Sequence, residues 1–199
     1  MERTRNRTGY KNKKVSGVTC HVSRVKYNQI MAVAAQTVLT SFDPLLEQLT
    51  ALCRTHYRER LISLAVFGSV GRGTPSIDSD IDFLVVARDL PVGRLRRVAG
   101  FQPVEAEMTS ILTKLSRSGL HTELSPVFKT PEEIQTGSPL LLNMVEDALI
   151  LYDRDDFLRQ ALQDLKSRLE KLGARRIWQG NAWYWDLKPD YHIGEIFQI

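Results

Sequence analysis

A short buried strand that runs into a glycine-rich turn constrains this chain more than any other feature. Residues 64–67 are apolar strand formers, and the glycines of the following segment, 68–73, end the strand at Phe67. Glycine adopts positive φ and lets a ligand approach the main chain closely, so this turn can present successive N–H groups to an anion. The sequence therefore predicts a phosphate-binding turn.

Two carboxylates follow at the start of the next apolar run. Asp80 and Asp82 are two residues apart, so on a strand they project from one face while Phe83 points to the other. Two carboxylates on one face repel each other unless a cation lies between them. Mg²⁺ is commonly held by one or two carboxylates together with substrate phosphates, so the pattern predicts a metal site beside the turn.

These residues resemble the signature of a known superfamily. Phe67-Gly68-Ser69, followed after ten residues by Asp80-Ile81-Asp82-Phe83, is similar to the motif of the DNA polymerase β-like nucleotidyltransferases. With Arg72-Gly73 in the turn, the motif most resembles that of the small prokaryotic members, the minimal nucleotidyltransferases. The resemblance implies an α+β fold like the polymerase β palm, a mixed sheet of about 4–5 strands flanked by helices, with a C-terminal helix and hairpin.

The resemblance also implies a reaction and the residues for it. A nucleoside monophosphate would pass from an NTP, with ATP the expected donor, to an acceptor hydroxyl, and pyrophosphate would be released. Gly68, Ser69 and Arg72 are expected to bind the nucleotide phosphates. Asp80 and Asp82 are expected to be catalytic and to hold two Mg²⁺ ions, for which Mn²⁺ could substitute.

A third carboxylate is expected from a later strand, and Glu123 is the candidate by its place in a predicted strand over 121–128. The resemblance gives it both a catalytic and a metal-binding role, although no motif identifies it. A solvent-facing glutamate fits the pattern nearly as well. Glu105, Glu107 and Glu146 are weaker candidates because they lie in predicted helices.

Composition restricts the class of protein. The chain has 199 residues, of which 43% are hydrophobic and 25% charged, which is ordinary for a globular domain with an appendage. No apolar run reaches the length of a membrane span, so we expect a cytoplasmic protein without a membrane partner. The two cysteines and four histidines are scattered singly, which gives no support to a zinc site.

Charge and pattern predict three parts: a disordered basic arm (1–28), a nucleotidyltransferase domain (29–152), and a C-terminal helix and aromatic hairpin (153–199). The arm has eight basic residues and one acid, so its net charge is +7. Because the net charge of the whole chain is +4, the remaining residues carry −3. It could bind nucleic acid, although a plain extension is favoured, and Met31 could be the natural start.

Within the domain, prolines predict helix boundaries. A helix over 29–40 is expected to end near Ser41, and a second to open at Asp43-Pro44. A long segment over 92–118 is expected to be interrupted at Pro103.

Further on, Thr130 to Glu133 predicts a capping box, and residues 148–152 predict a buried strand. Asp156 begins an amphipathic helix whose apolar stripe could pack on its own domain or on a partner helix. A hairpin is predicted to turn at 180–181. Its tryptophans could cover the core or, with the nearby basic residues, stack on bases, and the first reading is favoured.

The acceptor is left open by the sequence. Small members of the resembled group often act with an all-helical toxin-like protein, and others modify antibiotics or RNA ends. The alternative function is a nucleotide-binding or protein-interaction module of the same fold that has lost catalysis.

Overall fold

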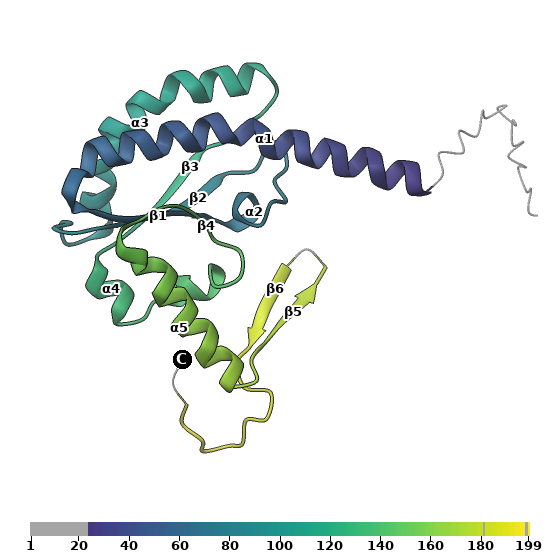
Figure 1. Ribbon diagram of the computed structural model, residues 1–199, viewed down its shortest axis with the longest axis vertical. Coiled ribbons are helices and arrows are strands. Elements are labelled where there is room, and N and C mark those ends of the chain that lie inside the picture. The colour runs from purple at the N-terminus through teal and green to yellow at the C-terminus, as the bar shows by residue number, and fades with distance from the viewer. Residues whose placement is uncertain (1–23, 181, 198) are drawn as a thin grey trace, which may run out of the picture.

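A four-stranded sheet with helices on both faces forms the body of the protein (Figure 1). The computed structural model describes residues 24–180, 182–197 and 199. The elements in chain order are α1 (Arg24–Tyr57), η1 (Arg58–Arg60), β1 (Leu61–Phe67), α2 (Gly68–Gly71), β2 (Ile81–Ala87), α3 (Arg94–Arg117), β3 (Leu124–Lys129), α4 (Pro131–Gln135), η2 (Pro139–Asn143), β4 (Leu149–Asp153), η3 (Arg154–Asp156), α5 (Phe157–Lys171), β5 (Arg175–Gln179) and β6 (Ala182–Asp186).

The sheet is mixed, which confirms the predicted α+β fold. Its order is β3-β2-β1-β4, in which β1 is antiparallel to β2 and β4, and β2 is parallel to β3. The parallel pair requires a crossover, and α3 supplies it. β3 is an edge strand, which is where a sheet tolerates a residue such as Pro126 that has no N–H to donate.

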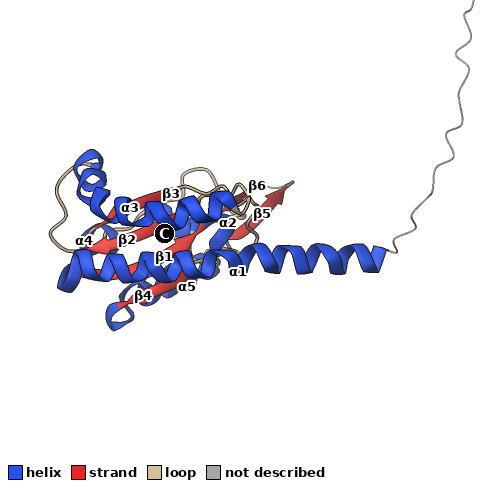
Figure 2. Ribbon diagram, turned by 90° about the horizontal axis from the view of Figure 1, so that it is seen from above, coloured by secondary structure: helices blue, strands red, loops and turns tan. Residues whose placement is uncertain are grey.

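Helices lie over the strands of the sheet (Figure 2). Each face of the sheet carries its own hydrophobic core because strand side chains alternate in direction. On one face α1 and α3 cover side chains that include Phe83 and Val85. On the other face α4, η2 and α5 cover Leu84 and Val86. Asp82 precedes Leu84 by two residues and therefore belongs to this second face.

Prolines interrupt neither α1 nor α3, which corrects two predicted boundaries. The sequence predicts a helix end near Ser41 with a new start at Pro44, and a break at Pro103, yet both helices are continuous. Buried side chains flank each proline: Phe42 and Leu45 in α1, and Phe101 and Val104 in α3. Packing these neighbours on one core keeps the segment helical despite the hydrogen bond that proline removes.

The predicted N-terminal arm lies mostly outside the described residues, which begin at 24. Residues 24–28 are the first residues of α1, so the prediction of disorder there is wrong. Extending a helix that is already formed costs little, because only nucleation is unfavourable. Met31 lies within α1. Across the part of the chain that the structure describes, no helix combines the length and apolar character that crossing a membrane requires.

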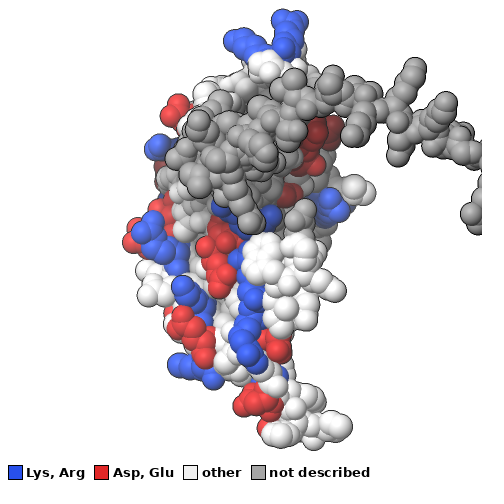
Figure 3. Space-filling view, turned by 90° about the vertical axis from the view of Figure 1, so that its right-hand side faces the viewer, with Lys and Arg blue, Asp and Glu red and all other residues white. Residues whose placement is uncertain are grey.

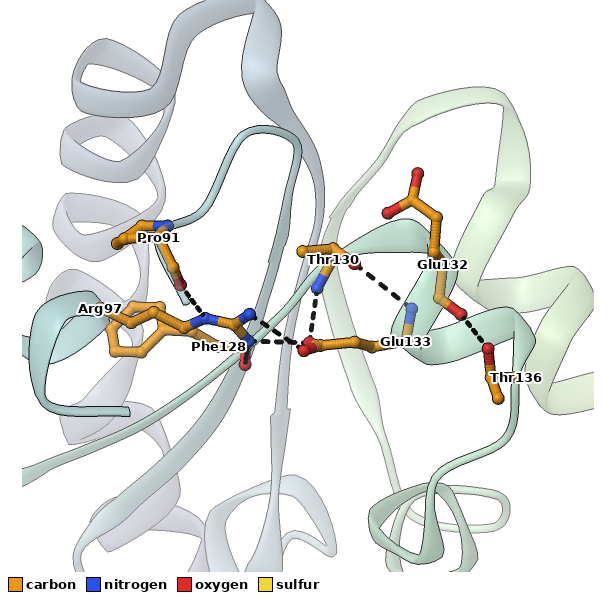
Figure 4. Close-up of polar contacts among 7 residues, drawn as sticks. All are labelled: Pro91, Arg97, Phe128, Thr130, Glu132, Glu133 and Thr136. Carbon is orange, nitrogen blue, oxygen red and sulfur yellow. Dashed lines mark hydrogen bonds and ion pairs between the residues drawn. The ribbon is translucent and has the colours of Figure 1, made fainter. Parts of the chain in front are cut away.

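β3 begins at Leu124, three residues later than predicted, and α4 begins as predicted. Glu133 and Thr130 form the capping box: the Glu133 amide donates to the Thr130 hydroxyl at 3.3 Å, and the Thr130 amide donates to Glu133 Oε2 at 3.0 Å. Arg97 of α3 forms a bidentate pair with the same Glu133 carboxylate, at 2.7 and 2.9 Å (Figure 4). This pair ties α3 to α4 across the end of β3.

The amphipathic helix predicted from Asp156 is α5, and its stripe packs on its own domain. Asp153 fixes the start of the helix, since its carboxylate accepts from the Leu158 and Arg159 amides at 3.0 Å each and from the buried Ser63 hydroxyl at 2.6 Å. Four leucines of the stripe are buried in the second core: Leu158, Leu162, Leu165 and Leu169. They are therefore not free to bind a partner helix.

The C-terminal hairpin forms where predicted. β5 and β6 pair antiparallel with Gln179 opposite Ala182, although residue 181 of the turn lies outside the described part. The Trp185 indole N–H donates to the Leu142 carbonyl at 3.0 Å, and Trp185 packs against the second core. This contact attaches the hairpin to the face of the sheet that carries Asp82.

Candidate active site

Asp80 and Asp82 lie where the chain enters β2, beside the end of β1. In the β1–β2 register Asp82 is directly opposite Phe67, the residue that precedes α2. Asp82 is half-buried at the sheet end, and Asp80 is exposed just outside the strand. The structure thus brings the acid pair and the glycine turn together, as the sequence predicts.

The acid pair is electrostatically coupled. Burial raises the pKa of the Asp82 carboxyl above its ordinary value, and the like charge of Asp80 raises it further. A hydrogen bond with Ser125 and the positive charge of Arg72 lower the same pKa. The charges of Asp80 and Arg72 therefore act on the Asp82 carboxylate in opposite directions. A bound cation would relieve the repulsion between Asp80 and Asp82.

Gly68 brings the main chain against the Asp82 carboxylate. Its φ is +71°, and a Cβ at this position would lie 2.5 Å from Asp82 Oδ2. Gly71 is equally restricted, because a Cβ there would lie 2.8 Å from the carbonyl oxygens of Val66 and Asp147. Gly68 is favoured because its φ is positive, and Gly71 because a Cβ there would collide with two main-chain oxygens.

The predicted phosphate turn is one turn of helix. The carbonyls of Gly68 and Ser69 accept from the Arg72 and Thr74 amides at 3.1 and 2.9 Å, which closes the turn. The first amides of a helix have no partner within it, and the preceding Phe67 provides no side-chain cap. Amides at 68 and 69 are therefore placed to bind an anion beside the acid pair, and Arg72 follows at the helix end.

Glu123 lies one residue before β3 and contacts the acid pair through its main chain. Its amide donates to Asp80 Oδ1 at 3.2 Å, and its carbonyl accepts from the Ile81 amide at 2.9 Å. The Glu123 side chain is exposed. The parallel register places Ser125, which sequence reasoning missed, directly beside Asp82. Only knowledge of this register could have identified Ser125.

The acid pair fits a divalent cation. No cluster of three or more His, Cys, Asp or Glu side chains arranged for a metal occurs among the described residues. Mg²⁺ does not need one, since one or two carboxylates together with phosphate oxygens and waters can complete its shell. Asp80 and Asp82, beside the main-chain amides of the glycine turn, suit that donor set. The role of Glu123 as a third carboxylate stays a prediction.

Comparison with known sequences decides the family. A profile described as "Nucleotidyltransferase domain" matches residues 46–152, more than half of the chain. The chain belongs to this nucleotidyltransferase family. The match spans β1 to β4 and therefore includes the glycine turn and the acid pair of this nucleotidyltransferase. It confirms the resemblance stated from the motif.

Two kinds of relative accompany this match. A protein of Methanocaldococcus jannaschii, named "Putative protein adenylyltransferase MJ1305", is 28% identical over 141 residues, which cover 70% of this nucleotidyltransferase and 90% of the relative. A solved structure titled "Crystal structure of the toxin-antitoxin with AMP-PNP" has 17% identity and a TM-score of 0.41, covering 64% of this chain and 92% of that one. Another, of the toxin-antitoxin MntA-HepT, has 15% identity and a TM-score of 0.37, covering 66% and 93%.

Proposed function

We propose that this nucleotidyltransferase transfers AMP from ATP to a hydroxyl group of a protein and releases pyrophosphate. Membership of the family supports nucleotidyl transfer, and the name of the archaeal relative supports AMP and a protein acceptor. The observation that carries the proposal is the proximity of the glycine turn to the acid pair: Asp82 is opposite Phe67 in the strand register, and a Cβ added at Gly68 would meet Asp82 Oδ2.

The residues present suit each part of this reaction. Asp80 and Asp82 would hold Mg²⁺, which when bound neutralises and orients the phosphates. The Gly68 and Ser69 amides would bind phosphate oxygens. Arg72 would stabilise the charge that develops on the departing pyrophosphate.

The transfer forms one bond and breaks one. The acceptor oxygen bonds to the α-phosphorus of ATP, the bond from that phosphorus to pyrophosphate breaks, and the proton of the acceptor hydroxyl passes to solvent water. Glu123 is the residue we propose on the acceptor side, because its main chain already contacts Asp80. Its carboxylate would orient the attacking hydroxyl.

Substitution of the acid pair tests the proposal. Asp80→Asn and Asp82→Asn each remove a charged ligand at nearly constant size, and we expect the transfer of labelled AMP to fall more than about a hundredfold. Asp78→Asn is the matched control, since Asp78 is exposed in the loop before β2. Label transfer should be measured with α-labelled ATP, Mg²⁺ and a cell lysate. Undiminished Mg²⁺-dependent transfer by either variant would contradict the assignment.

A binding module without catalysis is the second candidate. It is favoured by one observation, that no third carboxylate joins the pair in a metal cluster within the described residues. Such a module would bind labelled ATP in a Mg²⁺-dependent manner and release it unchanged. Calorimetry together with the transfer assay separates the two functions.

The first acceptor to test is a helical toxin-like protein encoded beside this chain, as the motif resemblance suggests. A nucleic-acid acceptor is less favoured. On the face in Figure 3, basic and acidic side chains of the described residues are interspersed, whereas phosphate backbones are usually bound by a surface of one sign.

A further inference from the structure

The three tryptophans of this chain all lie in the β5–β6 hairpin, but their surroundings differ. The Trp185 indole is hydrogen-bonded to Leu142 and serves to attach the hairpin. Trp178 is paired with Trp183 across the strands, closer to the turn, and 54% of Trp178 is exposed. Attachment to the core therefore accounts for Trp185 and leaves Trp178 unexplained.

Arg176 holds this aromatic pair in place. Its guanidinium carbon lies 4.8 Å from the ring centroid of Trp178 and 4.3 Å from that of Trp183. The same guanidinium pairs with Glu146 at 2.8 Å and with Asp147 at 2.6 Å, and only 9% of the side chain is exposed. Burial lowers the pKa of Arg176, but its interactions with Glu146 and Asp147 outweigh burial and raise it. The cation that positions the indoles is therefore permanently charged.

This arrangement lies next to the proposed phosphate turn. The Asp147 carbonyl is one of the two oxygens that exclude a side chain at Gly71. Asp147 thus contacts α2 through its carbonyl and Arg176 through its carboxylate. In both ribbon views the hairpin lies beside α2 (Figures 1 and 2), and it packs on the sheet face to which Asp82 belongs.

We infer that Trp178, supported by Trp183 and Arg176, is the stacking surface for the base of the nucleotide whose phosphates bind at α2. The inference rests on the proposed function and extends it to the nucleoside end of the substrate. An indole face held rigidly and left exposed suits a flat aromatic base, and stacking tolerates any base because each has a π-face. Acceptor-protein binding to the indole is the competing outcome of the test.

The hairpin carries its own reporter, because every tryptophan lies within it. ATP binding should quench the intrinsic tryptophan fluorescence of the full-length protein, whereas inorganic tripolyphosphate should bind without quenching it. Trp178→Ala should raise the KM for ATP about tenfold and leave inhibition by tripolyphosphate unchanged. Trp178→Phe should restore most of the affinity, since a phenyl ring also stacks.

Tyr184→Ala is the matched control. Tyr184 is 53% exposed on β6, next to Trp183 but on the opposite face of the hairpin, and we expect no change in KM. The inference is overturned if Trp178→Ala transfers AMP with an unchanged KM for ATP, or if only the KM for the acceptor protein rises. Absence of ATP binding and transfer in the wild-type protein would instead overturn the proposed function.

Discussion

Two arginines of similar burial tie parts of this molecule together, and they differ in what surrounds the guanidinium. Arg97 is 12% exposed and its donors meet fixed acceptors in the plane of the group: both oxygens of Glu133, the Pro91 carbonyl at 2.8 Å and the Phe128 carbonyl at 3.0 Å (Figure 4). Arg176 is 9% exposed and has indole rings over its faces. Within the described part of the chain, its Nε has no hydrogen-bond partner.

The comparison shows that burial of a charged residue does not by itself reveal its role. The hydrogen-bond partners of Arg97 belong to the loop before α3, to β3 and to α4, so they join parts of the scaffold. The partners of Arg176 are a turn that borders α2 and an indole that is still exposed. We therefore expect Arg97 to determine stability and Arg176 to determine substrate affinity.

The largest effect on stability is expected from Arg97→Ala. It leaves Glu133 and two carbonyls without their shared donor, and the free energy of unfolding should fall by about 2–4 kcal/mol. Urea unfolding should show a lower midpoint at an unchanged slope. The KM for ATP should stay constant in the folded variant, and a marked increase would remove the distinction between the two arginines.

Arg176→Ala should act mainly on the substrate. The indoles lose the cation that positions them, so the KM for ATP should rise about tenfold while stability falls by only about 1–2 kcal/mol. Arg175→Ala is the control, because Arg175 is exposed on the other face of the hairpin. If Arg176→Ala lost as much stability as Arg97→Ala and left the KM for ATP unchanged, the role of Arg176 would be structural, like that of Arg97.

Trp185→Phe should separate the attachment of the hairpin from the base stacking proposed for Trp178. It removes the hydrogen bond to Leu142 and some buried area, so the midpoint of urea unfolding should correspond to a loss of about 1 kcal/mol. Quenching of the remaining tryptophans by ATP should persist. If quenching disappears, the attachment and stacking roles are not separable.

The smallest expected effects are on the pH dependence of the free energy of unfolding, and they have opposite signs at Glu133 and at Asp82. The hydrogen bond from Arg97 is the main cause that lowers the pKa of Glu133 below its ordinary 4.5. The ionised Glu133 therefore stabilises the fold above pH 4.5, and this contribution is lost as the pH falls through the lowered pKa. Burial raises the pKa of Asp82 above 3.8, so its charged form destabilises the fold as pH rises through the raised value. Glu133→Gln should therefore weaken the acid-side loss of stability, and Asp82→Asn should increase stability at neutral pH. Urea titrations over a pH series measure both slopes.

The central strands and the acid pair could be read from the sequence because their determinants are local. Apolar runs define β1 and β2, and the spacing of Asp80 and Asp82 fixes a common face whatever the tertiary structure. The continuity of α1 through Pro44 could not be predicted, because packing of its buried neighbours overrides a local rule. Ser125 lies 43 positions after Asp82 and joins the site only through strand register.

The contacts of Arg176 likewise could not be predicted from the sequence. Its pairing with Glu146 spans 30 residues, and nothing in either local sequence indicates it. The aromatic composition of the hairpin suggested two readings, attachment and stacking. The structure assigns attachment to Trp185 and leaves Trp178 exposed, so the proposed stacking concerns a different residue from the one that attaches the hairpin.

The edge strand β3 has one more consequence. At its outer side Pro126 offers no amide, and the carbonyl of Phe128 is already occupied by Arg97. Both features disfavour strand addition by a neighbouring chain along β3. Under the proposed function, we therefore expect an acceptor protein to present a side chain to the nearby carboxylates and not to pair a strand with β3.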